Sequence, residues 1–148
     1  MVPTRAKIGL LLCMLWAWLA GCGEHAADAQ PGLRLLSVLY GQYRAAHRGQ
    51  LPANEADFKR FIVSERAEAL KQGGVSSVDE LFVSDRDHKP LVIRYRNDRQ
   101  WPLEGVVAYE QEGADGVRHI ATDLGGAAEL TDEQFNSRTA SGSNASKG

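Results

Sequence analysis

The chain has 148 residues, a formal net charge of −2 and two cysteines. This length suits a single domain with one modest hydrophobic core. The slightly acidic balance argues against nucleic acid as a main partner, because surfaces that bind nucleic acid are strongly basic.

The first 21 residues have the layout of a secretory signal peptide. Two basic residues form a positive start, residues 8–20 are apolar, and small residues precede Cys22. The apolar run is shorter than the roughly 20 residues that a membrane-spanning helix needs. We therefore expect residues 1–21 to be a cleaved signal peptide, and the small, polar residues 22–32 to form a tether.

The segment Leu19-Ala20-Gly21-Cys22 resembles the lipobox of bacterial lipoproteins. The resemblance implies cleavage before Cys22, a lipid on its sulfur and an acylated amino terminus, which would make the lipid bilayer a partner of the chain. Because Gly23 rather than Asp follows the cysteine, the resemblance also implies an outer-membrane location, with the domain in the periplasm or at the cell surface.

A helix is predicted over residues 33–47, at the start of a single domain that spans residues 33–136. Apolar and aromatic side chains recur there at steps of three and four residues, which places them on one helix face. Gly49 and Pro52 predict the end of this helix, because glycine tolerates a left-handed cap and proline cannot continue a helix. The side chains of the face are Leu36, Leu39, Tyr40, Tyr43 and His47.

Two further helical segments are predicted from their caps. Asn54 can cap a second helix, whose apolar face includes Phe58 and Phe61. Ser77 and Glu80 have the spacing of a capping box, which predicts one more short turn.

The hydrophobic pattern then changes to a period of two. Alternation over residues 91–95 predicts a half-buried strand. Residues 106–110 and 117–122 predict two more strands, and the turn residues 113–116 between them predict a hairpin. Residues 127–130 predict a short strand at the edge of the sheet.

The chain after the last predicted strand is not expected to form a further strand. Thr131 can cap a last turn that brings Phe135 into the core, and residues 137–148 are predicted to be a disordered tail. Helices followed by a small antiparallel sheet predict an α+β domain. In this domain a long N-terminal amphipathic helix and short helices would pack on a sheet of three to four strands.

The order of the elements over residues 33–122 resembles the soluble part of type II secretion major pseudopilins. In that family a long helix ends near a Gly-x-x-Pro-like break, matched here by Gly49-Gln50-Leu51-Pro52, and an Asp-rich loop leads into a short sheet, matched by residues 84–90. Because the chain lacks the prepilin peptidase site, the resemblance implies a lipid-tethered accessory module of the cell envelope. Its partner would be an envelope or secretion-machinery protein.

The densest polar cluster is the loop that contains Asp85 and Asp87. Two carboxylates on one loop can share a hard cation, and the pseudopilin resemblance also implies calcium at this loop. Calcium is the only cofactor that the sequence suggests. Arg86 and Lys89 would oppose a cation, so a turn in which the Asp side chains bind nearby backbone amides is the alternative.

A second candidate site is Trp101, with Arg94 and Arg96 nearby in the sequence. An exposed Trp101 could anchor a protein partner, because interface hot spots favour Trp and Arg. The alternative is that Trp101 closes one end of the core.

No catalytic constellation is evident, and the histidines lack the spacing of zinc ligands. The sequence is therefore interpreted as a non-enzymatic, membrane-anchored binding or accessory module. The alternative is a small periplasmic metal-dependent hydrolase centred on Asp85, Asp87 and His88.

Overall fold

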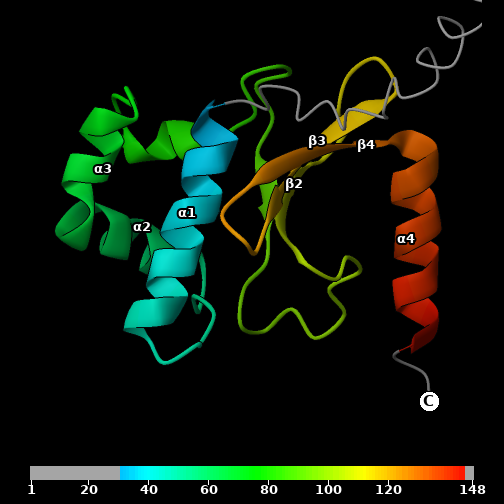
Figure 1. The fold of residues 1–148 in the computed structure, drawn as a ribbon, viewed down its shortest axis with the longest axis horizontal. Helices are drawn as coiled ribbons and strands as arrows, with labels where there is room; N and C mark the ends of the chain where they lie inside the picture. Colours follow the sequence, from blue (N-terminus) through cyan, green and yellow to red (C-terminus); the bar gives the residue numbers. More distant parts are fainter. Residues whose placement is uncertain (1–30, 146–148) are drawn as a thin grey trace, which may run out of the picture.

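The computed structural model describes residues 31–145, whose arrangement is shown in Figure 1. Helical elements come first, four strands follow, and a last helix ends the described chain. This order confirms the predicted α+β fold. The elements are α1 (Pro31–Ala46), α2 (Glu55–Glu65), α3 (Ala67–Gln72), the 3-10 helix η1 (Val78–Phe82), β1 (Leu91–Ile93), β2 (Val106–Glu110), β3 (Val117–Thr122), β4 (Ala127–Thr131) and α4 (Asp132–Ala145).

Helix α1 is the predicted amphipathic helix, and its apolar face is buried. It ends where Arg48 and Gly49 both take positive φ (55° and 82°), the left-handed conformation that closes many helices. It begins at Pro31, which suits a first helical position because the missing N–H would have no partner there. Pro31 and Gly32 therefore lie in α1 and not in the predicted tether, while the predicted signal peptide and Cys22 lie outside the described residues.

The caps of α2 and η1 are those that the sequence predicts. The Asn54 side chain accepts a hydrogen bond from the Asp57 N–H at 2.9 Å and so caps α2. Ser77 caps η1 by accepting from the Asp79 N–H. Glu80 accepts from the Ser76 N–H at 3.1 Å, one residue before the partner that a standard capping box uses.

The strands form one antiparallel sheet in the order β1-β2-β3-β4. Strands β2 and β3 have the predicted bounds, and a bulge interrupts their pairing between Val106 and Ala108. Strand β1 is shorter than predicted, because the Tyr95 N–H donates to Asp98 Oδ2 at 2.6 Å and the chain turns away from the sheet.

The sheet separates two hydrophobic cores, with α1 on one side and α4 on the other (Figure 1). The larger core lies between α1, α2, η1 and the sheet, and its largest side chains are Tyr40, Tyr43, Phe58, Phe61 and Phe82. The smaller core lies under α4 and consists of Leu103, Val106, Ile120, Leu130 and Phe135. Each face of the sheet therefore has its own helical cover.

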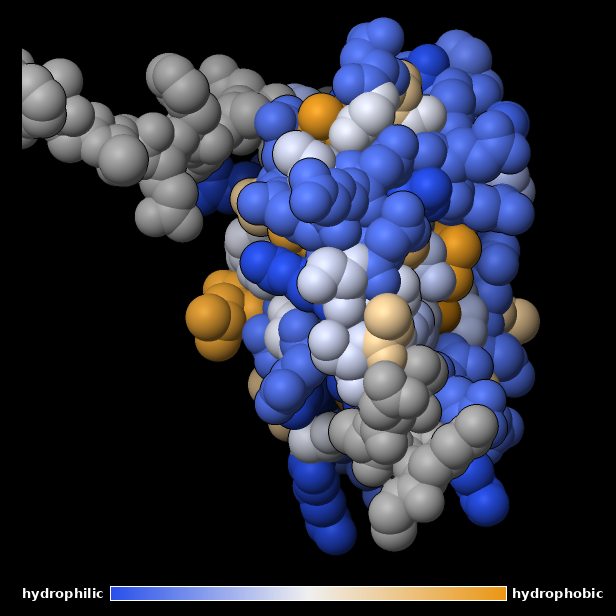
Figure 2. All heavy atoms as spheres, turned by 90° about the vertical axis from the view of Figure 1, so that its right-hand side faces the viewer, coloured by the Kyte–Doolittle hydropathy of each residue, from blue (hydrophilic) through white to orange (hydrophobic). Residues whose placement is uncertain are grey.

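Helix α4 corrects the predicted tail, because the chain is helical from Asp132 to Ala145 and not disordered from residue 137. Thr131 and Gln134 form a reciprocal capping box with bonds of 3.2 and 3.0 Å, and Phe135 is buried as predicted. The outer face of this side of the molecule is mostly hydrophilic (Figure 2). Among the described residues no helix is both long and apolar enough to cross a membrane.

Candidate functional site

A large hollow of the described surface lies beside α4, on the same side of the sheet. Its volume is about 580 Å³, and it is lined by Val92 and Tyr109 from β1 and β2 and by the loop of residues 95–102. Helix α4 packs on β3 and β4, so this part of the sheet face lacks its cover. We call the site the aromatic hollow, after Tyr95, Trp101 and Tyr109.

Trp101 is held in place from both ends of its ring system. Its Nε1 donates to the Val106 carbonyl at 2.8 Å, and its ring centroid lies 5.4 Å from that of Tyr109. The Tyr109 ring in turn lies 5.1 Å from the ring of Phe135 in α4. Trp101 thus combines features of both sequence alternatives, because it is half-buried at the edge of the smaller core and also lines the aromatic hollow.

The rim of the aromatic hollow is ordered by a single carboxylate. Asp98 Oδ2 accepts from the Tyr95 N–H at 2.6 Å, and the Asp98 carbonyl accepts from the Trp101 N–H at 3.3 Å. This turn places three exposed polar side chains around the hollow. They are Asn97, Arg99 and Gln100.

The Tyr109 phenol offers a hydrogen-bond donor to a ligand, whereas the Tyr95 ring also packs against the larger core on the α1 side of the sheet. Burial raises the pKa of Tyr95 and of Tyr109, so both hydroxyls are protonated at neutral pH. Within residues 31–145 neither hydroxyl has a hydrogen-bond partner, and neither is sealed from solvent. The aromatic hollow therefore combines apolar ring faces with polar groups that can fix an orientation, as binding sites for proteins and small molecules do.

The two arginines predicted beside Trp101 do not join it. Arg96 donates to the Leu51 carbonyl at 3.2 and 3.3 Å and ties the end of β1 to the segment after α1. Arg94 lines a different, smaller cavity. The role of all three residues in partner binding remains a prediction.

The Asp-rich loop has the geometry of the predicted turn. Asp87 Oδ1 accepts from the Lys89 N–H at 3.0 Å, as in an Asx turn, and Asp85 is exposed. The described part of the chain contains no group of three or more His, Cys, Asp or Glu side chains placed to hold a metal ion. Calcium binding by Asp85 and Asp87 remains a prediction.

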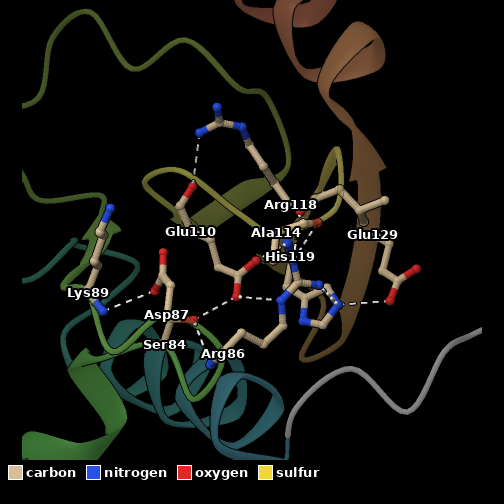
Figure 3. A network of polar contacts seen from close by, with 10 residues as sticks. Ser84, Arg86, Asp87, Lys89, Glu110, Ala114, Arg118, His119 and Glu129 are labelled. Carbon is tan, nitrogen blue, oxygen red and sulfur yellow. Dashed lines mark hydrogen bonds and ion pairs between the residues drawn. The ribbon is translucent and has the colours of Figure 1, made fainter.

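The loop is attached to the sheet by a polar network around Glu110 (Figure 3). Glu110 is fully buried. Its carboxylate accepts hydrogen bonds from Ser84 Oγ at 2.7 Å and from the His119 N–H at 2.8 Å. Arg86 Nε lies 3.5 Å from Glu110 Oε1. Arg86 also donates to the carbonyls of Ala114 and Val117. These contacts hold the loop in a fixed position against β2 and β3.

This network is not predicted from the sequence. Its one sequence signal is the two-residue period of β2, because the alternation that places Ala108 on the inner face also places Glu110 there. His119 Nε2 lies 3.0 Å from Arg86 Nη1 and 2.8 Å from Glu129 Oε1. A single imidazole nitrogen can accept from the first or donate to the second, but not both at once.

Comparison with known proteins gives three similarities, all to ubiquitin-related modifiers. The chain is 32% identical over 92 residues to ubiquitin-related modifier 1 of Aspergillus oryzae, which covers 62% of this chain and 76% of that protein. For the Chaetomium thermophilum protein the identity is 29%, covering 62% and 83%. For the Dictyostelium discoideum homolog it is 34% over 73 residues, covering 49% and 71%. No protein-family model and no solved structure matches.

These relatives contradict the identification as a bacterial lipoprotein with a pseudopilin-like domain. The lipobox rests on four residues after a short apolar run, and the pseudopilin resemblance rests on the order of elements, so both are easily matched by chance. The predicted envelope role, the metal-dependent hydrolase alternative and the outer-membrane location are wrong for the same reason. With 32% identity to a relative of which it covers 76%, the chain belongs to the ubiquitin-related modifier 1 family.

Proposed function

We propose that this chain acts as a ubiquitin-related protein modifier that partner proteins recognise through the aromatic hollow. Its relatives carry the name of modifiers, and a modifier acts by being recognised by other proteins. The observation that carries the proposal is the grouping of Tyr95, Trp101 and Tyr109 around one hollow on a sheet face that α4 leaves free.

The chemistry of the aromatic hollow suits a protein partner. Trp, Tyr and Arg are enriched among residues that dominate binding energy at interfaces, and all three types line this hollow, with Arg99 as the arginine. A rigid Trp101 loses little conformational entropy on binding, because its Nε1 and its ring are already fixed. The free hydroxyl of Tyr109 can then select partners by hydrogen bonding.

Site-specific photo-crosslinking in the cells that produce the protein tests this proposal. A photo-reactive residue replaces Gln100 at the rim of the hollow or, as the matched control, Gln72 at the end of α3; both positions are exposed. We expect a defined set of crosslinked proteins from position 100 that is absent from position 72. The same set from both positions would contradict the proposal.

A second substitution separates recognition from folding. Arg99→Glu reverses a charge at the rim, and the Arg99 side chain has no hydrogen bond or ion pair within the described chain, so the fold is expected to persist. We expect the position-100 crosslinks to fall in this variant while its circular dichroism spectrum is unchanged. Unaltered crosslinking would show that partners do not use the rim.

A further inference from the structure

A second cavity lies on the α1 side of the sheet and has a volume of about 270 Å³. The last turns of α1 contribute Tyr40 and Arg44 to its wall, the end of β1 contributes Arg94, and the turn after β3 contributes Asp123. Its position is fixed by the hydrogen bond from Tyr40 Oη to the Arg94 carbonyl, at 2.7 Å. Two arginines from distant parts of the sequence therefore face one small space.

Neither of these guanidinium groups has an ion-pair partner among the described residues, although Asp123 lines the same cavity. The Nε atoms of Arg44 and Arg94 are both buried without a hydrogen-bond partner, and neither side chain forms an ion pair with any residue that the structure describes. Arg86 also has a buried Nε without a hydrogen bond, but this atom lies 3.5 Å from the Glu110 carboxylate, and the other nitrogens of Arg86 donate to backbone carbonyls. Arg118 donates several hydrogen bonds and faces Asp132. A buried charged donor without a partner costs free energy, and two like charges at one cavity add repulsion.

The two arginines of this cavity lack a negatively charged hydrogen-bond acceptor among the described residues. The planar guanidinium fork matches the oxygens of phosphate and carboxylate groups, and a charge-assisted bond of this kind is stronger than one between neutral groups. The volume exceeds the roughly 30 Å³ of one water molecule several-fold and suits a small ion better than a large ligand. Asp123 lines the same space, so a bound phosphate would turn its protonated oxygen toward Asp123, and a carboxylate would keep both oxygens on the side of the two arginines.

We propose that Arg44 and Arg94 form a binding site for a small oxyanion, a phosphate or carboxylate group, between α1 and the sheet. The anion supplies the acceptors that both Nε groups lack and joins the end of α1 to the end of β1. This site is separate from the aromatic hollow, so the proposal does not depend on the proposed function.

The test measures thermal unfolding and binding heat of the full-length chain with inorganic phosphate, and in parallel with acetate. The variants are Arg44→Gln and Arg94→Gln, and the control is Arg34→Gln, which removes the same charge from an exposed position of α1. We expect saturable binding by the unchanged chain and by the control. Each cavity variant should bind about tenfold more weakly or worse, because it loses charge-assisted hydrogen bonds.

The anion-free state provides a second readout. Without an anion, Arg44→Gln relieves the repulsion between the two guanidinium groups, so its unfolding temperature should equal or exceed that of the unchanged chain. Arg44→Lys keeps the charge but loses the fork, and it should bind more weakly than the unchanged chain if the fork is used. Tighter binding of phosphate than acetate would assign a phosphoryl ligand, and the reverse a carboxylate.

Two results would overturn the proposal. One is the absence of saturable binding by both phosphate and acetate. The other is equal weakening in Arg34→Gln, which would show a general charge effect and no site at Arg44 and Arg94.

Discussion

At the scale of single residues, Glu110 has the largest expected effect on stability. Its buried carboxylate satisfies the Ser84 hydroxyl and the His119 N–H and faces Arg86. Removing one partner of a buried charged group leaves the other groups without water or a counter-charge. Glu110 thus connects the loop of residues 84–90 to the sheet through buried hydrogen bonds.

We expect Glu110→Ala to lower the free energy of unfolding by about 3 to 5 kcal/mol, the range for breaking a buried ion pair. Glu104→Ala is the matched control, because Glu104 is exposed, and its effect should stay within about 0.5 kcal/mol. Urea unfolding at neutral pH measures both. A loss below about 1 kcal/mol for Glu110→Ala would mean that the network contributes little, since a neutral hydrogen bond alone contributes that much.

A second residue pair gives the molecule a pH dependence. Tyr43 Oη donates to Asp57 Oδ2 at 2.6 Å, and the Ala53 N–H donates to the same oxygen at 3.0 Å. The hydrogen bond from Tyr43, followed by that from Ala53, lowers the pKa of Asp57 below its ordinary value of 3.8. A carboxyl group whose pKa is lower in the folded state stabilises the fold above the unfolded pKa, and this contribution is lost as pH falls through the folded pKa.

We therefore expect unfolding by urea to become easier as the pH falls below 3.8, with part of this dependence absent in Tyr43→Phe. At neutral pH the substitution should cost about 1.5 to 3 kcal/mol, because it removes a hydrogen bond to a charged group. The midpoint of urea unfolding, measured from pH 7 to pH 2.5, gives both quantities. An identical acid profile in Tyr43→Phe would contradict the assignment.

At the scale of elements, α4 depends on tertiary contacts more than on helix propensity. It is rich in Ser, Thr, Asn and Gly, which are poor helix formers, so the sequence favours a disordered tail. The capping box of Thr131 and the burial of Phe135 fix its first turns. Near its end Gly142 lies so close to the segment before β2 that a Cβ atom there would be 2.4 Å from the Pro102 carbonyl oxygen.

Replacing glycine by alanine should accordingly have opposite effects in the two long helices. Gly41→Ala in α1 meets open space and should stabilise the fold by about 0.5 to 1 kcal/mol through helix propensity. Gly142→Ala gains the same propensity but forces α4 away from Pro102, so the net effect should be destabilising. Urea unfolding of the two variants side by side checks the signs, and stabilisation by both would show that α4 does not press on this segment.

At the scale of the whole molecule, the sequence predicts what depends on neighbours along the chain. The bounds of β2 and β3 follow from alternation and from turn residues, and the start of α2 follows from the Asn54 cap. The candidate site is harder to predict from the sequence, because Trp101 acquires Tyr95 and Tyr109 as neighbours only through strand register and the Asp98 turn. The positions of Arg94 and Arg96 are likewise not predictable from their closeness to Trp101 in the sequence. Arg94 lines a different cavity, and Arg96 donates to the Leu51 carbonyl.

The sheet shared by both cores makes the molecule one cooperative unit, and this can be tested with one substitution in each core. Phe58 is fully buried beside α1, and Phe135 anchors α4 on the opposite face. Phe58→Ala should lower the free energy of unfolding by about 3 to 5 kcal/mol, and Phe135→Ala by less, because Phe135 lies at the edge of a smaller core. Because β2 and β3 contribute to both cores, each variant should show a single transition by calorimetry and by far-ultraviolet circular dichroism.

The two residues are not in contact, so their effects on the free energy of unfolding should add in the double variant. A separate early transition in Phe135→Ala would instead show that α4 and the aromatic hollow unfold independently of the α1 side.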